Sequence, residues 1–154
     1  MKKRLRKIIN VFKGHIFVFH TLLFILIPWL NAEVNAEAKN ISSINCNIQE
    51  TPCTLLLSGR EVTLDIQPKP IRAMNDLTFQ VKITGEQVSS PPHIDLGMPG
   101  MRMGPNRVVL RETAPNIYEG AGVIVRCPSG RRTWSATVTF HDLGEATFIF
   151  DVIY

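Results

Sequence analysis

The sequence has few residues that could build a catalytic centre. Its 154 residues include three cysteines and four histidines, and no C-x-x-C redox motif is present. No serine lies in a nucleophile-elbow pattern, and no pair of carboxylates flanks a glycine-rich pocket motif. Thiol-redox chemistry would need a reactive Cys46 or Cys127, and neither has a neighbouring motif that supports it. We therefore expect a binding protein and not an enzyme.

An excess of positive charge is also missing from most of the chain. The net charge of +4 arises at the front, where six of the 17 basic residues precede Lys39. From Lys39 onward the basic and acidic residues are equal in number. This balance argues against a nucleic-acid partner, since such proteins carry a basic patch or stripe. No small-molecule substrate is evident either.

The basic front is followed by an uncharged apolar run from Ile16 to Leu30. This run is shorter than the roughly 20 residues that a membrane-spanning helix needs. Small residues in A-x-A-like spacing follow between Val34 and Ala38, as at a cleavage site. We therefore expect residues 1–38 to be a signal peptide that exports the protein to the periplasm. An uncleaved helix that retains it at the inner membrane is the alternative.

Residues 39–52 are mostly small or polar and are expected to form a tether. From Cys53 onward, strand-length runs alternate apolar and polar residues and are separated by Gly, Pro, Asn and Asp. The pattern predicts an all-β domain over residues 53–154, an immunoglobulin-like antiparallel β-sandwich of about seven strands. A small barrel is the alternative. The expected strands are Val62–Ile66, Leu77–Ile83, Ile94–Met98, Val108–Leu110, Tyr118–Arg126, Trp134–Phe140 and Ala146–Val152.

The odd number of cysteines predicts one disulfide and one free thiol, because oxidation is allowed outside the cytoplasm. A bond between Cys46 and Cys53 would close a short loop. A bond between Cys53 and Cys127 would instead join the front of the domain to its far end. The sequence leaves the pairing open.

Three of the four methionines beyond Met1 fall within six positions, as Met98, Met101 and Met103. Thioethers are soft, uncharged ligands that suit Cu(I) and select against hard cations. Pro99 and the nearby glycines turn the chain sharply and would let the three sulfur atoms converge. His93 is a candidate imidazole ligand, and Cys127 a further soft ligand if it is not in a disulfide. The sequence therefore predicts a copper(I) site in this loop.

Packing is the competing interpretation of the same residues. Met98 continues the alternation of Ile94 and Leu96, and methionine often fills irregular gaps in a core. His141 is expected to be a surface turn residue. The arginines at 126, 131 and 132 flank a turn, and they are either solvated charges or a surface that docks onto an acidic partner.

Three segments together resemble the YtkA-like family, which is related in pattern to FixH-type proteins. They are Met98–Asn106, Tyr118–Gly120 and Val125–Trp134, and the resemblance extends over about Thr51 to Tyr154. It implies an immunoglobulin-like domain outside the bacterial cytoplasmic membrane, often linked to copper proteins or to respiratory-oxidase assembly. FixH-type members keep a membrane helix, whereas this chain has a signal-like segment. The family supplies no established ligand set.

We thus expect an extracytoplasmic copper-binding or copper-delivery domain that supports an oxidase through a membrane respiratory or copper-trafficking partner. The alternative is a metal-free interaction module, in which the methionine loop is an apolar docking surface for a membrane complex.

Overall fold

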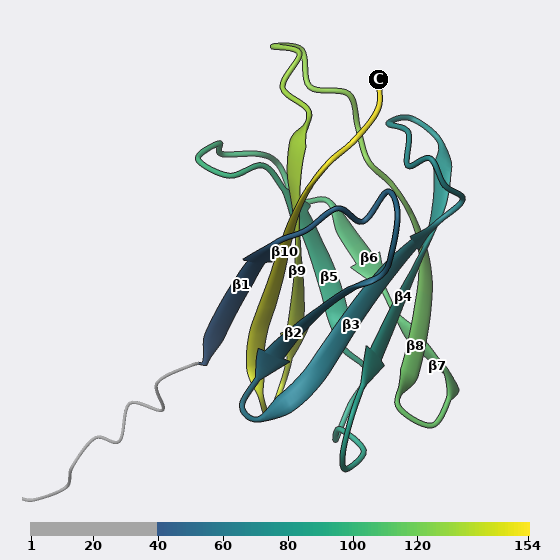
Figure 1. The fold of residues 1–154 in the computed structure, drawn as a ribbon, viewed down its shortest axis with the longest axis vertical. Helices are drawn as coiled ribbons and strands as arrows, with labels where there is room; N and C mark the ends of the chain where they lie inside the picture. Colours follow the sequence, from purple (N-terminus) through teal and green to yellow (C-terminus); the bar gives the residue numbers. More distant parts are fainter. Residues whose placement is uncertain (1–39) are drawn as a thin grey trace, which may run out of the picture. The chain divides into compact units, whose positions relative to one another are not determined.

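The computed structural model describes residues 40–154, and the expected signal peptide lies outside them. These residues form two five-stranded sheets packed face to face as a β-sandwich (Figure 1). Within residues 40–154, no helix is long and apolar enough to cross a membrane. The strands are β1 (Ile41–Asn45), β2 (Cys53–Leu57), β3 (Arg60–Gln67), β4 (Asp76–Ile83), β5 (His93–Gly97), β6 (Arg107–Val109), β7 (Arg111–Ala114), β8 (Ile117–Val123), β9 (Thr133–Phe140) and β10 (Gly144–Asp151).

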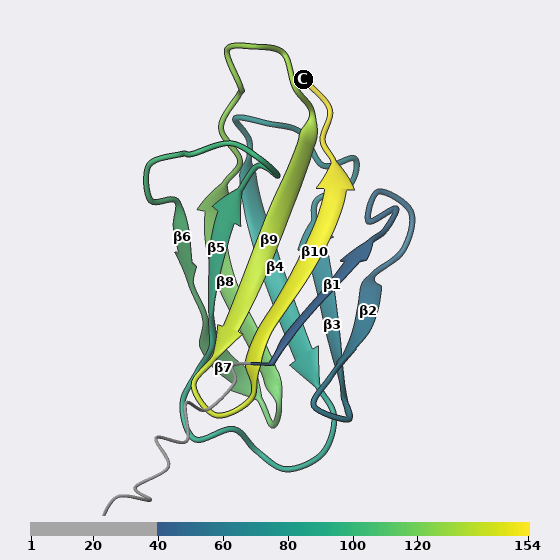
Figure 2. The same cartoon turned by 90° about the vertical axis from the view of Figure 1, so that its left-hand side faces the viewer.

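The strand order is β1-β10-β9-β5-β6 in one sheet and β2-β3-β4-β8-β7 in the other. Neighbouring strands are antiparallel except at one edge, where β1 runs parallel to β10 (Figure 2). The prediction of a β-sandwich is confirmed, and each of the seven expected strands is present. The strand count was too low, because β1, β2 and β7 bring the total to ten among the described residues.

The prediction of a tether over residues 39–52 is wrong where β1 lies. Ile41 to Asn45 pair in register with Glu145 to Ile149, and Cys46 N–H continues the ladder by donating to Ile149 O at 2.9 Å. The pairing partner is about 100 residues away in sequence, and β1 buries no residue fully. Because β1 is stabilised by backbone pairing with a strand that is distant in sequence, and not by an apolar face of its own, no local sequence pattern predicts it.

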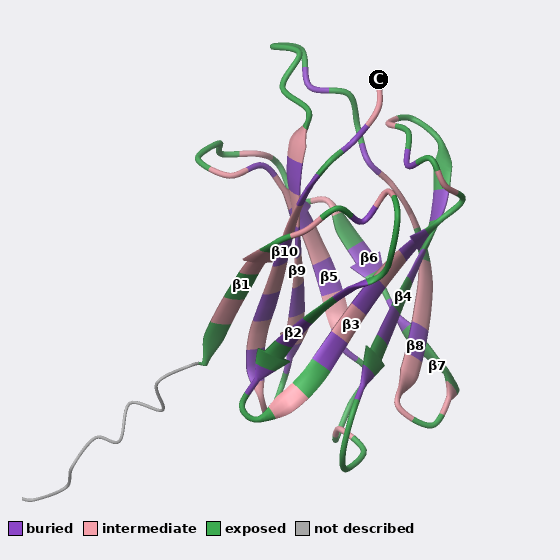
Figure 3. Ribbon diagram, in the orientation of Figure 1, coloured by how far each residue is buried: buried purple, intermediate pink, exposed green. Residues whose placement is uncertain are grey.

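Alternation of side chains builds the core between the sheets (Figure 3). On β4, β9 and β10 every second residue is buried, as the period of a strand requires. Trp134 on β9 is 0% exposed and belongs to this buried apolar cluster. No charged or polar residue among those described is fully buried.

The structure settles the cysteine pairing that the sequence left open. Cys46 and Cys53 form a disulfide that links the end of β1 to the start of β2. Cys127 is free and buried. The prediction of one disulfide and one free thiol is thereby confirmed.

The two ends of the sandwich differ in what they carry. At the end where the described chain begins, the entry end, Glu145 N–H donates a hydrogen bond to Asn40 O at 2.8 Å beside the β9–β10 turn. The opposite end, the loop end, includes the connections between β3 and β4, between β5 and β6 and between β8 and β9 (Figure 2). The β1–β2 connection and the residues after β10 also reach it. The methionine cluster lies at the loop end.

Candidate functional site

A tight turn at the end of β5 places Met98 beside Met101. Met101 N–H donates to Met98 O at 3.0 Å, and the two residues form an isolated antiparallel bridge. Pro99 takes the second position of the turn and Gly100 the third, where its φ of +72° favours glycine. Directly opposed residues of an antiparallel pair project their side chains to the same face. The turn therefore brings two thioethers to one side of the loop.

The three methionines lie at the rim of the core. Met98 is 4% exposed and extends the buried row of Ile94 and Leu96. Met101 is 37% exposed, whereas Met103 is partly buried and packs against the core cluster. The exposure of the three side chains is thus graded, from buried Met98 through partly buried Met103 to exposed Met101.

The connection between β8 and β9 contacts this turn. Arg131 Nη2 donates to Pro99 O at 2.8 Å, which joins the two loops. The same connection carries Cys127, whose Sγ lies 3.0 Å from Ser129 Oγ. The loop end therefore holds three thioethers and one free thiol on two loops that are joined by a hydrogen bond.

The surroundings of Cys127 favour the thiolate. The hydrogen bond from Ser129 is the largest influence and lowers the pKa of the thiol below its usual range, against an opposing effect of burial. Backbone N–H groups of Ser129 and Arg131, together with the charge of Arg131, lower this pKa further. Because the thiolate is the form that binds soft metals, this shift makes Cys127 a better ligand.

Tyr154 organises the Cys127 loop and was not among the residues singled out from the sequence. Its hydroxyl accepts a hydrogen bond from Cys127 N–H at 3.1 Å and donates one to Arg131 O. Trp134 Nε1–H also reaches this hydroxyl at 3.5 Å. No sequence pattern links Tyr154 to Cys127, since the contact depends on β10 ending beside the start of β9.

The structure does not bring His93 to the methionines. His93 begins β5 at the entry end, five positions before Met98, which corresponds to roughly 16 Å along a strand. It is also on the outer face, where its Nε2 lies 3.4 Å from Asp95 Oδ2, whereas Met98 is on the inner face. His141 is exposed and beside Asp142, also at the entry end, as expected for a turn residue.

Hard or mixed donor sets are not assembled in the described part of the chain. Residues 40–154 contain no group of three or more His, Cys, Asp or Glu side chains that could hold a metal ion.

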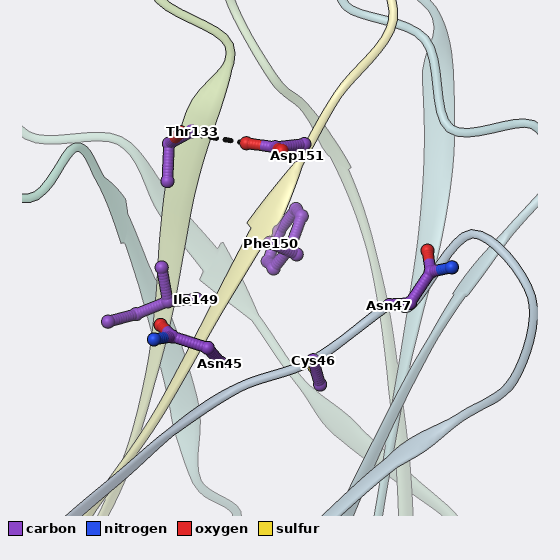
Figure 4. A pocket seen from close by; sticks show the side chains of 7 residues that line it. All are labelled: Asn45, Cys46, Asn47, Thr133, Ile149, Phe150 and Asp151. Carbon is purple, nitrogen blue, oxygen red and sulfur yellow. Dashed lines mark hydrogen bonds between the residues drawn. The ribbon is translucent and has the colours of Figure 1, made fainter.

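A separate hollow lies beside the end of β1 and holds none of the predicted ligands (Figure 4). Its wall includes Cys46, which is bound in the disulfide, and Asp151, whose carboxylate accepts a hydrogen bond from Thr133 Oγ1 at 2.7 Å. The other lining residues are Asn45, Asn47, Ile149 and Phe150. The Cys46 sulfur is bound in the disulfide, the Asp151 carboxylate is hydrogen-bonded to Thr133, and the other lining side chains are uncharged. The hollow therefore offers no evident reactive group.

Comparison with known proteins leaves the chain unassigned to a family. No protein-family model matches it, and no curated protein matches it.

Proposed function

We propose that this protein is an extracytoplasmic copper-binding or copper-delivery protein whose metal site is the methionine turn. One observation supports the proposal: Met98 and Met101 form an antiparallel backbone bridge, a pairing that projects both side chains to the same face, with Met103 two residues further on. Met101 is 37% exposed, so its side chain can be reached from solvent.

The chemistry of the donors favours Cu(I) over other ions. Thioethers are soft and keep their affinity when the pH falls, since they are not protonated in water. Magnesium and calcium prefer oxygen ligands, and zinc prefers thiolate and imidazole nitrogen. Apolar residues around Met98 exclude water from one side of the turn, which restricts access to the metal.

The proposed ligands are Met98, Met101 and Met103, with Cys127 as a fourth ligand from the neighbouring loop. The contact between Arg131 and Pro99 holds the two loops together, and the lowered pKa of Cys127 favours its binding form. His93 is left out of this set because it lies at the entry end and on the outer face. The site thus differs from the sequence prediction by one residue.

The proposal extends to where the protein works and to its relatives. A basic and then apolar front is the pattern of an exported protein, and the Cys46–Cys53 disulfide suits an oxidising compartment. We place the domain with the immunoglobulin-like YtkA-like proteins on the motifs quoted above. Its proposed role is to supply or protect copper for a respiratory oxidase, by binding and not by catalysis.

An anaerobic titration with Cu(I) against a chromophoric chelator tests this function, with the full-length protein in nonionic detergent. One copper per chain should bind. The double variant M101L/M103L should bind at least about 100-fold more weakly, because even residues that only orient a ligand change metal affinity by about 10–100-fold. Leucine keeps the apolar bulk and removes the sulfur.

Met74 supplies the matched control, since it is 64% exposed and lies outside the turn. M74L should bind copper as the unmodified protein does. Absence of competition by the unmodified protein, or equal binding by M101L/M103L, would refute the copper site and favour a metal-free interaction module.

A further inference from the structure

Five arginines gather on the three loops of the loop end. The loops are residues 68–75, 98–106 and 124–132, and all five arginines are exposed. Met74 N–H donates to Ile124 O at 2.8 Å, and Arg131 Nη2 donates to Pro99 O at 2.8 Å, so the loops lie side by side (Figure 2). The arginines are Arg72, Arg102, Arg126, Arg131 and Arg132.

This arginine cluster has no carboxylate partner within the described chain. None of the five forms an ion pair there, whereas Lys69 pairs with Asp65 and Arg107 pairs with Asp95. The other residues from 40 to 154 include five basic and eleven acidic side chains. The three loops therefore carry five arginines and no acidic residue, although Glu50, Asp76 and Asp151 border them, and the other described residues have an excess of acidic side chains. Like charges held together without counter-charges repel each other, and such a field attracts an acidic surface.

Two of these arginines are held in place. The guanidinium carbons of Arg126 and Arg132 lie 5.5 Å and 6.0 Å from the centre of the Tyr154 ring. The Tyr154 hydroxyl in turn bonds to the backbone at Cys127 and Arg131. A cation fixed over an aromatic ring loses less conformational freedom when it binds a partner.

Exposed apolar side chains accompany the charges. Met74, Met101 and Val125 are 64%, 37% and 41% exposed, one on each loop. They are three of the six large hydrophobic residues that the described chain exposes. Arginine and methionine are enriched in protein interfaces, whereas lysine is depleted.

We propose that the loop end docks onto a carboxylate-rich surface of a partner protein. Arginine forks would pair with its Asp and Glu side chains, and the three apolar residues would fill the centre of the contact. A lipid surface fits less well, because the three loops contain none of the Trp, Phe or Leu residues that anchor proteins in a bilayer interface.

The proposed docking does not depend on copper, because the side chains that would contact the partner are arginines and exposed apolar residues. If both proposals hold, Arg102 between Met101 and Met103 places the docked partner directly at the metal. M101L/M103L should lose copper and keep docking, so the two proposals can fail separately.

The test uses fluorescence anisotropy of a labelled peptide rich in Glu and Leu, added to full-length protein in nonionic detergent with copper chelated. The peptide should bind at low salt, and binding should weaken as salt rises. R102Q/R126Q should weaken it by about fivefold, the effect of losing two exposed ion pairs. The charge-matched control K82Q/R111Q, with both changes outside the loop end, should leave it unchanged.

Replacing Arg126 also removes its contact with the Tyr154 ring, which could disturb the loop. R72Q/R102Q serves as a second variant, because these two side chains form no ion pair, hydrogen bond or ring contact with the described residues. It should also bind about fivefold more weakly. The proposal is overturned if the Glu and Leu peptide does not bind, or if K82Q/R111Q weakens its binding as much as the loop-end variants do. It is also overturned if a matched peptide of Gln and Leu binds as tightly as the Glu and Leu peptide. Tighter binding to micelles doped with phosphatidylglycerol, or to single-stranded DNA, would overturn it as well.

Discussion

The Tyr154 hydroxyl accepts a hydrogen bond from Cys127 N–H at 3.1 Å, across 27 residues of sequence. The same hydroxyl donates to Arg131 O. One side chain, three residues beyond the last strand, thus holds both sides of the loop that carries the free thiol and three arginines. The shape of the loop end therefore depends on Tyr154 as much as on its own turn residues.

Replacing Tyr154 by phenylalanine should lower the free energy of unfolding by about 1–2 kcal/mol, because a shielded N–H and a carbonyl lose their partner. Urea unfolding followed by tryptophan fluorescence measures this change. Tyr118→Phe is the control, since Tyr118 is 1% exposed and its hydroxyl forms no hydrogen bond with the described residues. Equal losses in the two variants would show that the Tyr154 hydroxyl has no special role.

The pKa of Cys127 should depend on Ser129. In the metal-free protein the hydrogen bond from Ser129 lowers the pKa of the thiol, so alkylation should reach half its maximal rate at a lower pH than for an unperturbed thiol. Ser129→Ala removes the largest cause of that shift, and the midpoint should move to higher pH. Iodoacetamide labelling followed by mass spectrometry reports the profile, since Cys127 is the free cysteine.

Ser90→Ala is the control for this measurement, because Ser90 is exposed on the β4–β5 connection at the entry end. The pH midpoint of Cys127 alkylation in Ser90→Ala should match that of the unmodified protein. An unchanged midpoint in Ser129→Ala would contradict the role given to Ser129.

Gly120 is required where the two sheets meet at β6 and β8. A Cβ atom there would lie 2.4 Å from Val109 O, a backbone atom that cannot move without disturbing β6. Gly120→Ala should therefore destabilise the fold by about 1–3 kcal/mol. Gly104→Ala is the matched control, since nothing lies within 4 Å of its Cβ position. Thermal unfolding distinguishes the two variants. Equal unfolding midpoints would mean that β6 shifts to accept the added Cβ atom without loss of stability.

The strands that could be predicted are those whose own alternation shows a buried face. On β3, β4, β9 and β10, apolar residues at every second position were sufficient. β7 has the sequence Arg-Glu-Thr-Ala and no fully buried residue, so it lacks the apolar alternation that would predict a strand paired with β8. In β2 the exposed Leu56 between two buried leucines hid the period.

For the candidate site, the sequence predicted the turn but not its surroundings. Pro99-Gly100 indicated a turn because both residues favour its backbone angles. The position of His93 was also readable, because it is out of phase with Ile94 and Met98 and must take the other face of a strand. The contacts of Arg131 with Pro99 and of Tyr154 with Cys127 join loops distant in sequence, and only the fold reveals them.

Copper X-ray absorption of the full-length protein loaded with one equivalent of Cu(I) tests the central claim most directly. The account predicts a first coordination shell dominated by sulfur, and loss of most of that sulfur signal in M101L/M103L but not in M74L. A shell of nitrogen and oxygen, or a sulfur shell that the double variant leaves intact, would contradict the methionine turn as the metal site.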